Sequence, residues 1–287
     1  MIHKIEVRAL TGTRQNGNFL YFTGGWKSRR QSKCVDSDRG KTVVSMNYDD
    51  SPYPIRGDLV ASHQRAWERL ARAGTWLTGD ERVKVMAETR HARDCSTCAE
   101  LKAALSPYAV TNAHDAATDL PRGWIDMIHL IVADPGRLTH GWYKKTIAGG
   151  IAETHFVEIL SVLVHTTAMD TFARCIDMPL RVLPEPQPGA PTQYRPKEAR
   201  QHDAWAPHVS WGEFGANEAD FFVGTQVNIR TALTLVPDEA RGFFDLVEAQ
   251  YLSDEQMRDF SQEFRAISHP QIELLAARVS ALNQCTY

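Results

Sequence analysis

The stretch Gln271-Ile-Glu-Leu-Leu-Ala-Ala-Arg-Val-Ser-Ala-Leu-Asn-Gln-Cys285-Thr-Tyr287 carries the helical signal that decides the fold class. Its apolar residues recur at spacings of three and four, so they share one face of an α-helix, and we expect that face to be buried. Glu273 and Arg278 lie off the apolar face. The apolar residues are Ile272, Leu275, Ala276, Val279 and Leu282. The pattern predicts a helix that ends just before Cys285.

The same helical periodicity recurs from residue 57 onward, interrupted by prolines and glycines, and no alternating strand pattern persists. Residues 58–73 are amphipathic and stop at Gly74, and Thr78-Gly-Asp-Glu opens a second helix that we expect to run toward Cys95. Further periodic runs occupy about 121–133, 153–177, 217–235, 238–251, 254–266 and 270–284. The sequence therefore predicts an all-α fold.

Composition limits the partners that this chain is built to bind. The 287 residues are 43 % hydrophobic and 23 % charged, which fits one large domain or two small ones. The net charge is −3 and no run of Lys and Arg is present, so neither nucleic acid nor an anionic membrane is expected as a partner. Small molecules or other proteins are the expected partners.

The cytoplasm is the expected compartment. No stretch approaches the roughly eighteen uninterrupted apolar residues of a membrane span, and the N-terminus lacks the apolar region of a secretory signal. Five cysteines in that compartment are expected to be reduced thiols or a catalytic pair, because an odd count does not suit a disulfide framework.

The chain divides by composition into four segments. Residues 1–45 are polar with little periodicity and are interpreted as a disordered or spurious leader, with Met46 as an alternative start. Residues 46–178 form a first helical half with a C-x-x-C motif, and residues 179–215 form a connector rich in proline and tryptophan. Residues 216–287 are interpreted as a second, incomplete helical half. Each half carries a cysteine after an amphipathic helix, which suggests a tandem arrangement.

The first cysteine motif offers a candidate redox site. Glu88, His91, Cys95 and Cys98 stand at i, i+3, i+7 and i+10, which on one continuous helix is an arc of about 80°. A cysteine nucleophile needs a base such as His, a carboxylate can orient that His, and a second thiol can resolve the oxidised sulfur. These four residue types suit a dithiol peroxidase.

Other interpretations of the same motif remain open. A lone C-x-x-C occurs by chance, and two semi-buried reduced cysteines can be purely structural. A zinc site needs two further ligands, and the sequence offers no second C-x-x-C or H-x₃₋₅-H at a convincing distance. We therefore expect no metal and no cofactor.

The remaining candidates are weaker in sequence. His129, His140 and His155 lack thiol or carboxylate neighbours along the chain that would give them a task. His165 lies within an apolar helix and is expected to be a hydrogen-bonded core histidine. Cys175 is expected to pack in the interior.

Glu273, twelve residues before Cys285 within Glu-Leu-Leu-Ala-Ala-Arg-Val-Ser-Ala-Leu-Asn-Gln-Cys, resembles the signature of the alkylhydroperoxidase D and carboxymuconolactone decarboxylase superfamily. That resemblance implies an all-α fold that usually oligomerises, here as two alkylhydroperoxidase D-like helical halves with the second truncated. It implies peroxide reduction by a vicinal dithiol, with a proton relay formed by the Glu and a later His. The first motif departs from this signature, since Val83 stands twelve residues before Cys95 and Lys102 stands where the His is due.

Carried over to this sequence, the resemblance assigns Glu273 as the base and Cys285 as the resolving thiol. The attacking residue would follow Tyr287, and the His would come four residues later. Three explanations compete: a deliberately shortened chain, a truncated inactive paralogue, and a gene model ended at a UGA codon that the organism reads as selenocysteine. We favour the third, because a selenol is more acidic and a better leaving group than a thiol.

The resulting prediction is a thiol- or selenol-dependent peroxidase that reduces hydroperoxides through a C-x-x-C-type site, with the activity of the present chain resting on Cys95 and Cys98. Its partners would be a small-molecule hydroperoxide and a thiol reductant, either a protein or a low-molecular-weight thiol, and we expect a homo-oligomer. Two alternatives are kept. One is a decarboxylase or lactone-processing enzyme of the same superfamily, in which a carboxylate or His acts as general acid or base. The other is a non-catalytic helical oligomerisation protein.

Overall fold

The computed structural model describes residues 46–106, 109–222 and 228–282. Within these ranges the protein is α-helical, with short 3-10 turns and two isolated β-bridges but no strand. The predicted all-α class is confirmed. The predicted leader, residues 1–45, and the candidate Cys285 lie outside the described residues.

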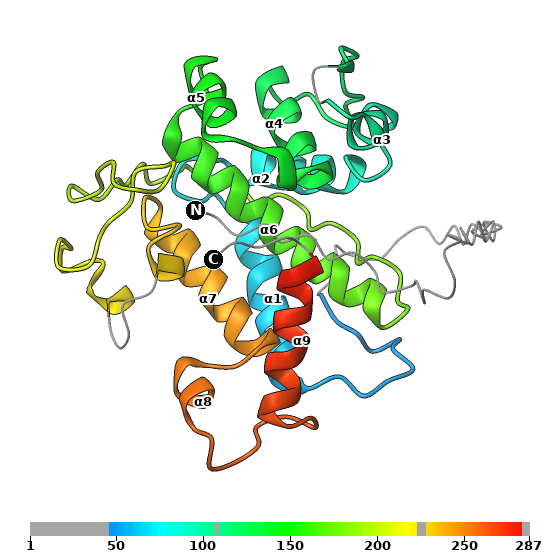
Figure 1. Ribbon diagram of the computed structural model, residues 1–287, viewed down its shortest axis with the longest axis vertical. Coiled ribbons are helices and arrows are strands. Elements are labelled where there is room, and N and C mark those ends of the chain that lie inside the picture. Colours follow the sequence, from blue (N-terminus) through cyan, green and yellow to red (C-terminus); the bar gives the residue numbers. More distant parts are fainter. Residues whose placement is uncertain (1–45, 107–108, 223–227, 283–287) are drawn as a thin grey trace.

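The described helices follow one another as shown in Figure 1. The α-helices are α1 (Gly57–Ala71), α2 (Gly79–His91), α3 (Ser96–Ala103), α4 (Arg122–Ala133), α5 (His140–Ala148), α6 (Glu153–Cys175), α7 (Pro237–Gln250), α8 (Asp254–Arg258) and α9 (His269–Leu282), and the 3-10 turns are η2 (Pro135–Arg137), η3 (Ala219–Phe221) and η4 (Asn228–Arg230).

Helix α6 is the centre of the core. It runs through the middle of the molecule, and α1, α2, α4 and α7 all pack against it (Figure 1). Val157, Ile159 and Val162 are fully buried along its length. By length and composition alone α6 could cross a membrane, yet 83 % of its most apolar window is buried inside the protein. The burial identifies α6 as a core helix. Its residues are apolar all round because other parts of the protein pack against it on every side.

The chain breaks between α2 and α3, where the sequence predicted one helix toward Cys95. After His91, the N–H groups of Arg93 and Asp94 donate to carbonyl oxygens three residues back, at 3.2 and 3.0 Å, which tightens and ends the helix. Cys95 then takes extended backbone, with φ −69° and ψ 124°, immediately before α3. The predicted arrangement of four site residues along one helix is therefore wrong.

Two other predicted helices differ from the structure, and one helix was not predicted. The described part of 217–235 contains η3 and η4 in place of a helix. The Thr231 and Thr234 hydroxyls donate to nearby carbonyl oxygens, and such bonds compete with helical ones. The predicted helix 254–266 ends at Arg258, and the unpredicted α5 begins where the Thr139 side chain accepts from the next turn.

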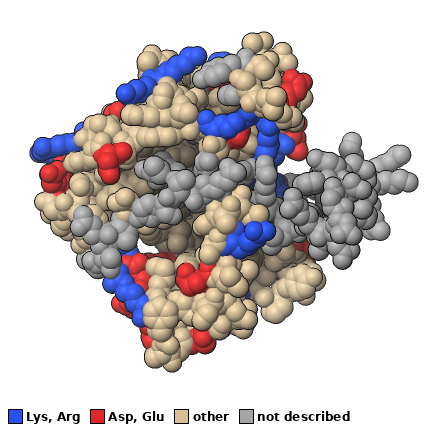
Figure 2. All heavy atoms as spheres, in the orientation of Figure 1, with Lys and Arg blue, Asp and Glu red and all other residues tan. Residues whose placement is uncertain are grey.

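The connector 179–215 is largely without helix, as predicted, and backbone bonds tie it to the helical body. The N–H of Gln187 donates to the carbonyl of Ala71 at 2.7 Å, and that of Gln193 donates to Thr75 at 2.7 Å. Basic and acidic side chains are intermingled over the face shown in Figure 2, in keeping with the small net charge.

Helix α9 forms where periodicity predicted it, but its apolar face is mostly exposed. Only Ile272 on that face is buried, whereas Leu275 is 54 % exposed and Val279 44 % exposed. The expectation of a buried stripe is wrong for these residues. Periodicity predicts which residues share an apolar face, but not whether another element packs against that face. In the described chain most of the apolar face of α9 is not covered.

Candidate metal centre

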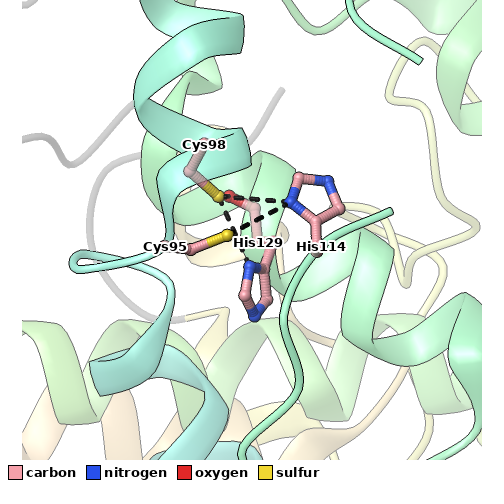
Figure 3. A group of neighbouring side chains, drawn as sticks. All are labelled: Cys95, Cys98, His114 and His129. Atoms are coloured by element: carbon pink, nitrogen blue, oxygen red, sulfur yellow. Dashed lines mark hydrogen bonds between the residues drawn. The ribbon is translucent and has the colours of Figure 1, made fainter. Parts of the chain in front are cut away.

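Four buried side chains from three parts of the chain converge on one point. Cys95 and Cys98 come from the start of α3, His114 from the loop that follows α3, and His129 from α4. Figure 3 shows the two sulfurs and two imidazole nitrogens turned toward one another. The four potential ligand atoms all lie within 4.8 Å of one another. We call these residues the Cys–His cluster.

The spacing within the Cys–His cluster matches a tetrahedral coordination shell. Cys98 Sγ lies 3.4 Å from His114 Nδ1 and 3.4 Å from His129 Nδ1, and Cys95 Sγ lies 3.8 Å from His114 Nδ1. With Zn–S bonds of about 2.3 Å and Zn–N bonds of about 2.0–2.1 Å, neighbouring S and N corners of a tetrahedron are about 3.5 Å apart. The donors therefore stand where a single ion can reach all four.

Local contacts explain how the chain brings the cluster together. Because Cys95 precedes α3 and Cys98 lies in its first turn, the two thiols face the same side. The Thr97 hydroxyl donates to the carbonyl of Ala113 at 3.1 Å, which holds the loop against α3. Arg122, at the start of α4, donates to the carbonyl of His114 at 2.7 Å. The loop is thus fixed on both sides of the cluster.

Glu88 fixes the orientation of His129. Its Oε2 lies 3.1 Å from His129 Nε2, so Nε2 carries the proton and Nδ1 turns its lone pair toward the cluster. The other carboxylate oxygen accepts from the N–H groups of Ala117 and Thr118 and from the Thr118 hydroxyl, at 2.7–2.9 Å. Glu88 is fully buried and cannot rotate without breaking these bonds.

His91 stays outside the donor set. Its ring lies edge-on to that of His129, with centroids 5.8 Å apart, and its Nε2 has no hydrogen-bond partner. Of the four residues predicted to act together, Glu88 reaches the thiols only through His129, and His91 has no hydrogen bond to Cys95 or Cys98. The histidines beside the thiols are two that the sequence left without a role.

Burial sets the protonation of the cluster. It raises the pKa of the Cys98 thiol to about 12, with the neighbouring Cys95 adding to the effect. Burial is also the main cause that lowers the pKa of His129, although the hydrogen bond that His129 donates to Glu88 acts in the opposite direction. Burial lowers the pKa of His114 as well. Both imidazoles are thus held neutral, the form that binds a metal. A divalent cation would hold the thiols as thiolates.

Sequence reasoning missed His114 and His129 for a physical reason. Fourteen residues separate them in the sequence, and His114 lies in a loop whereas His129 lies in a helix. They therefore form no short H-x₃₋₅-H motif that would mark them as metal ligands. Their convergence on Cys98 depends on how α4 packs against α3. A signal within reach of the sequence was the presence of two unassigned histidines within about thirty residues after the C-x-x-C.

The predicted C-terminal site is separate from the Cys–His cluster. Glu273 lies on α9, which Figure 1 places well away from α3. Its Oε1 accepts from the Tyr251 hydroxyl at 2.5 Å and lies 3.6 Å from His269 Nε2. Cys285, its predicted partner, lies outside the described residues.

Of the two weaker candidates, His165 is buried and Cys175 is exposed. His165 is fully buried in α6, donates from Nδ1 to the carbonyl of Ser161 at 2.7 Å and faces Arg69 Nη2 at 2.7 Å. The expectation of a hydrogen-bonded core histidine is confirmed. Cys175 is exposed at the end of α6, so the expectation that it packs in the interior is wrong.

The chain matches no protein-family model, no curated protein and no solved structure.

Proposed function

We propose that the Cys–His cluster binds one Zn²⁺ ion as a structural centre. The observation that carries the proposal is the set of four buried donors, two S and two N, which all lie within 4.8 Å of one another, with three S to N distances of 3.4–3.8 Å. Structural zinc sites are tetrahedral and closed, with four protein ligands and no position left for water. The residues Cys95, Cys98, His114 and His129 provide that number and kind of ligand.

The donor types favour zinc over other common ions. Calcium and magnesium prefer oxygen ligands, and none of the four donors is a carboxylate. A tetrahedral set of two thiolates and two imidazoles is typical of zinc. The Glu88 carboxylate behind His129 adds the outer contact that zinc-binding histidines usually have. In a reducing cytoplasm, the compartment we propose, the thiols remain available for the metal.

The proposed ion would stabilise a part of the fold that is weak on its own. Helix α3 has only eight residues, which is too short for stable helix formation without tertiary contacts. Its main packing partner is α4. A metal that joins α3, the His114 loop and α4 would couple zinc binding to the folding of this region.

The test is the zinc content of the purified full chain, measured by elemental mass spectrometry under reducing conditions. We expect one zinc per chain, and loss of the metal in Cys98→Ser and His129→Ala. Cys175→Ser is the matched control, because it removes an exposed thiol that is not one of the four donors and should keep full zinc content. A fully reduced wild-type chain that neither contains nor takes up zinc would contradict the proposal.

We propose peroxide reduction as a second function, located at the C-terminal helix and not at Cys95 and Cys98. The observation in its favour is the setting of Glu273, the residue that the resemblance assigns as base: it accepts a bond from Tyr251 and lies beside His269. The Tyr251 hydroxyl and the His269 ring thus both lie beside the Glu273 carboxylate, where they would exchange protons with it. The tandem arrangement of two alkylhydroperoxidase D-like halves belongs to this proposal.

The proposed reaction consumes one hydroperoxide and two thiol reductants. A thiolate or selenolate attacks the O–O bond, which releases the alcohol and leaves a sulfenic or selenenic acid. Cys285 displaces water from it to form a disulfide or selenenylsulfide, and a thiol reductant, the proposed partner, restores both groups.

Zinc binding and a redox role make opposite claims about Cys95 and Cys98, so a single comparison separates them. If these thiols hold zinc and peroxide is reduced at α9, thiol-dependent peroxide consumption should be the same in the wild type and in a folded Cys95→Ser variant, and lower in Glu273→Gln. If Cys95→Ser abolishes consumption while Glu273→Gln does not, the redox site is the N-terminal pair and the assignment to α9 fails. Activity that survives thiol alkylation would point to the decarboxylase alternative.

A further inference from the structure

The loop that follows α3 forms the outer cover of the Cys–His cluster. Residues 111–113 and 115–117 of this loop are exposed, whereas His114 between them is only 7 % exposed and turns inward to both sulfurs. On the α2 and α4 side, Glu88 and His129 are fully buried. The loop is therefore the thinnest part of the cover over the two thiols.

Two hydrogen bonds hold this part of the loop against the helices. The Thr97 hydroxyl donates to the carbonyl of Ala113 at 3.1 Å, and Arg122 donates to the carbonyl of His114 at 2.7 Å. Both bonds lie at part-buried positions, where water can replace them. The contact of His114 with the proposed ion would be the third attachment, so the loop is the part of the cover that opens most easily.

The two thiols are placed to form a bond with each other. Cys95 precedes α3 and Cys98 lies in its first turn, and Figure 3 shows their sulfur atoms next to each other, within 4.8 Å. Thiol–disulfide exchange is the typical chemistry of C-x-x-C pairs at the start of a helix. Because both cysteines belong to the same short element, a disulfide between them requires no movement of α4.

We propose that the Cys–His cluster is a redox switch, in which a low-molecular-weight disulfide converts Cys95 and Cys98 to a disulfide and releases the zinc ion. The inference rests on the proposed zinc centre and adds its regulation. Zinc and the disulfide exclude each other, because zinc binds thiolates and the disulfide uses the same two sulfur atoms. The oxidant is not a peroxide, so the switch is independent of the reaction proposed at α9.

Cys95 is the thiol that the small disulfide reaches first. Its sulfur lies 3.8 Å from His114 Nδ1 in the loop. The sulfur of Cys98 lies 3.4 Å from His129 Nδ1 and 3.9 Å from the carbonyl oxygen of His129 in α4. Opening of the loop therefore uncovers Cys95 while α4 still covers Cys98.

The reaction consists of two exchange steps. The Cys95 thiolate attacks one sulfur of the small disulfide, whose S–S bond breaks and releases one thiolate. The Cys98 thiolate then attacks the Cys95 sulfur, so the bond between the cysteines forms and a second thiolate leaves. The pair loses two electrons, the small disulfide gains them, and the two released thiolates balance the charge of the departing Zn²⁺. The state of the switch thus follows the ratio of small disulfide to thiol.

The test uses the full chain loaded with one zinc ion and kept without oxygen in mixtures of reduced and oxidised glutathione. A zinc-sensitive dye follows the release of the metal, and alkylation followed by peptide mass spectrometry identifies the paired cysteines. Thr97→Val removes the hydroxyl that holds the loop but keeps all four ligands.

Two variants serve as controls. Thr166→Val is matched to Thr97→Val, because the Thr166 hydroxyl bonds within α6, to the carbonyl of Val162 at 2.8 Å. Cys175→Ser removes an exposed thiol that is not one of the donors. Both should respond to glutathione as the wild type does.

We expect oxidised glutathione to release one zinc ion per chain together with the formation of one Cys95–Cys98 disulfide. Excess reduced glutathione, with zinc added, should reverse both changes. Thr97→Val should release its zinc about fivefold faster than the wild type, which is the effect of losing one hydrogen bond.

Failure of the switch and failure of the zinc centre give different results. A loaded chain that keeps its zinc and both thiols in oxidised glutathione overturns the switch and leaves the zinc centre in place. Release of zinc without the Cys95–Cys98 disulfide also overturns the switch. Equal rates of release from Thr97→Val and the wild type contradict entry of the oxidant through the loop. A chain that takes up no zinc contradicts the zinc centre and the switch together.

Discussion

At the scale of single residues, the buried carboxylate of Glu88 sets the orientation of His129. Its four hydrogen bonds leave it one conformation, and that conformation presents a carboxylate oxygen to His129 Nε2. The consequence is that His129 exists in the one neutral tautomer that turns Nδ1 to Cys98.

Glu88→Gln should therefore weaken zinc binding without removing a ligand. The amide NH₂ group cannot accept the proton of His129 Nε2, so the preferred tautomer is lost, and loss of such an outer contact costs about 10–100-fold in affinity. The affinity is measured by competition with a chromophoric chelator. Glu100→Gln, on the exposed side of α3, is the control and should bind as the wild type does. Equal affinity in all three proteins would show that Glu88 does not orient His129.

The burial of His63 leads us to expect that the free energy of unfolding depends on pH. Burial lowers its pKa to about 4, while the unfolded chain retains an ordinary value near 6.5. Because the folded pKa is depressed, the unfolded chain binds the proton first as the pH falls, and stability is lost between about pH 6.5 and pH 4.

His63→Asn removes this titration while keeping a polar group beside Tyr48. Urea unfolding at pH 7 and pH 5 should show that the wild type loses about 2 kcal/mol more than the variant over this interval. Comparing the two proteins cancels other groups, such as Glu158, whose raised pKa acts in the opposite direction. The same loss in both proteins would mean that His63 is protonated in the folded state.

At the scale of elements, the sequence located those helices whose burial follows a simple period. The predicted runs 58–73, 121–133 and 238–251 agree closely with α1, α4 and α7. The sequence failed where backbone conformation depends on local competition, as at the break after His91 and in the turns around Thr231. For the site it identified the thiol pair, but the pairing with His114 and His129 depends on tertiary packing that no spacing encodes.

Thr78 gives a prediction for α2. Its hydroxyl accepts from the N–H of Glu81, whose carboxylate accepts from the N–H of Thr78. Because α2 packs against α6 and is part of the core, Thr78→Ala should lower the free energy of unfolding by about 1 kcal/mol in urea denaturation. Ser253 makes the same motif at the five-residue α8, so Ser253→Ala is a matched comparison and should have a much smaller effect. Equal losses would show that α8 unfolds together with the core.

At the scale of the whole molecule, a buried polar network links helices far apart in sequence. Arg82 of α2 bonds to Glu158 of α6 and Glu239 of α7, and Glu239 also accepts from Arg69 of α1. Removing one member would leave a buried charge without its partner, which is more costly than the pair is stabilising. The network therefore constrains how α1, α2, α6 and α7 fit together.

Zinc removal should affect the stability of the whole chain. At free zinc about a thousand times the dissociation constant, binding adds about 4 kcal/mol, which corresponds to about 10 °C in Tm for a protein of this size. In scanning calorimetry under reducing conditions, a strong chelator should lower the Tm of the wild type by that amount. Cys98→Ser should unfold at the lower temperature whether or not the chelator is present. A chelator that leaves the wild-type Tm unchanged would exclude a stabilising metal.

All four donors and Glu88 come from one continuous stretch, residues 88–129. The ribosome therefore delivers the complete ligand set before it has made α6 or α7. This early part of the chain would capture the proposed ion during synthesis, before the helices that later pack on it have been made. The supply of the metal in the cell would then affect the nascent chain. A shortage of the metal would cause a defect in folding and not a loss of activity in protein that has already folded.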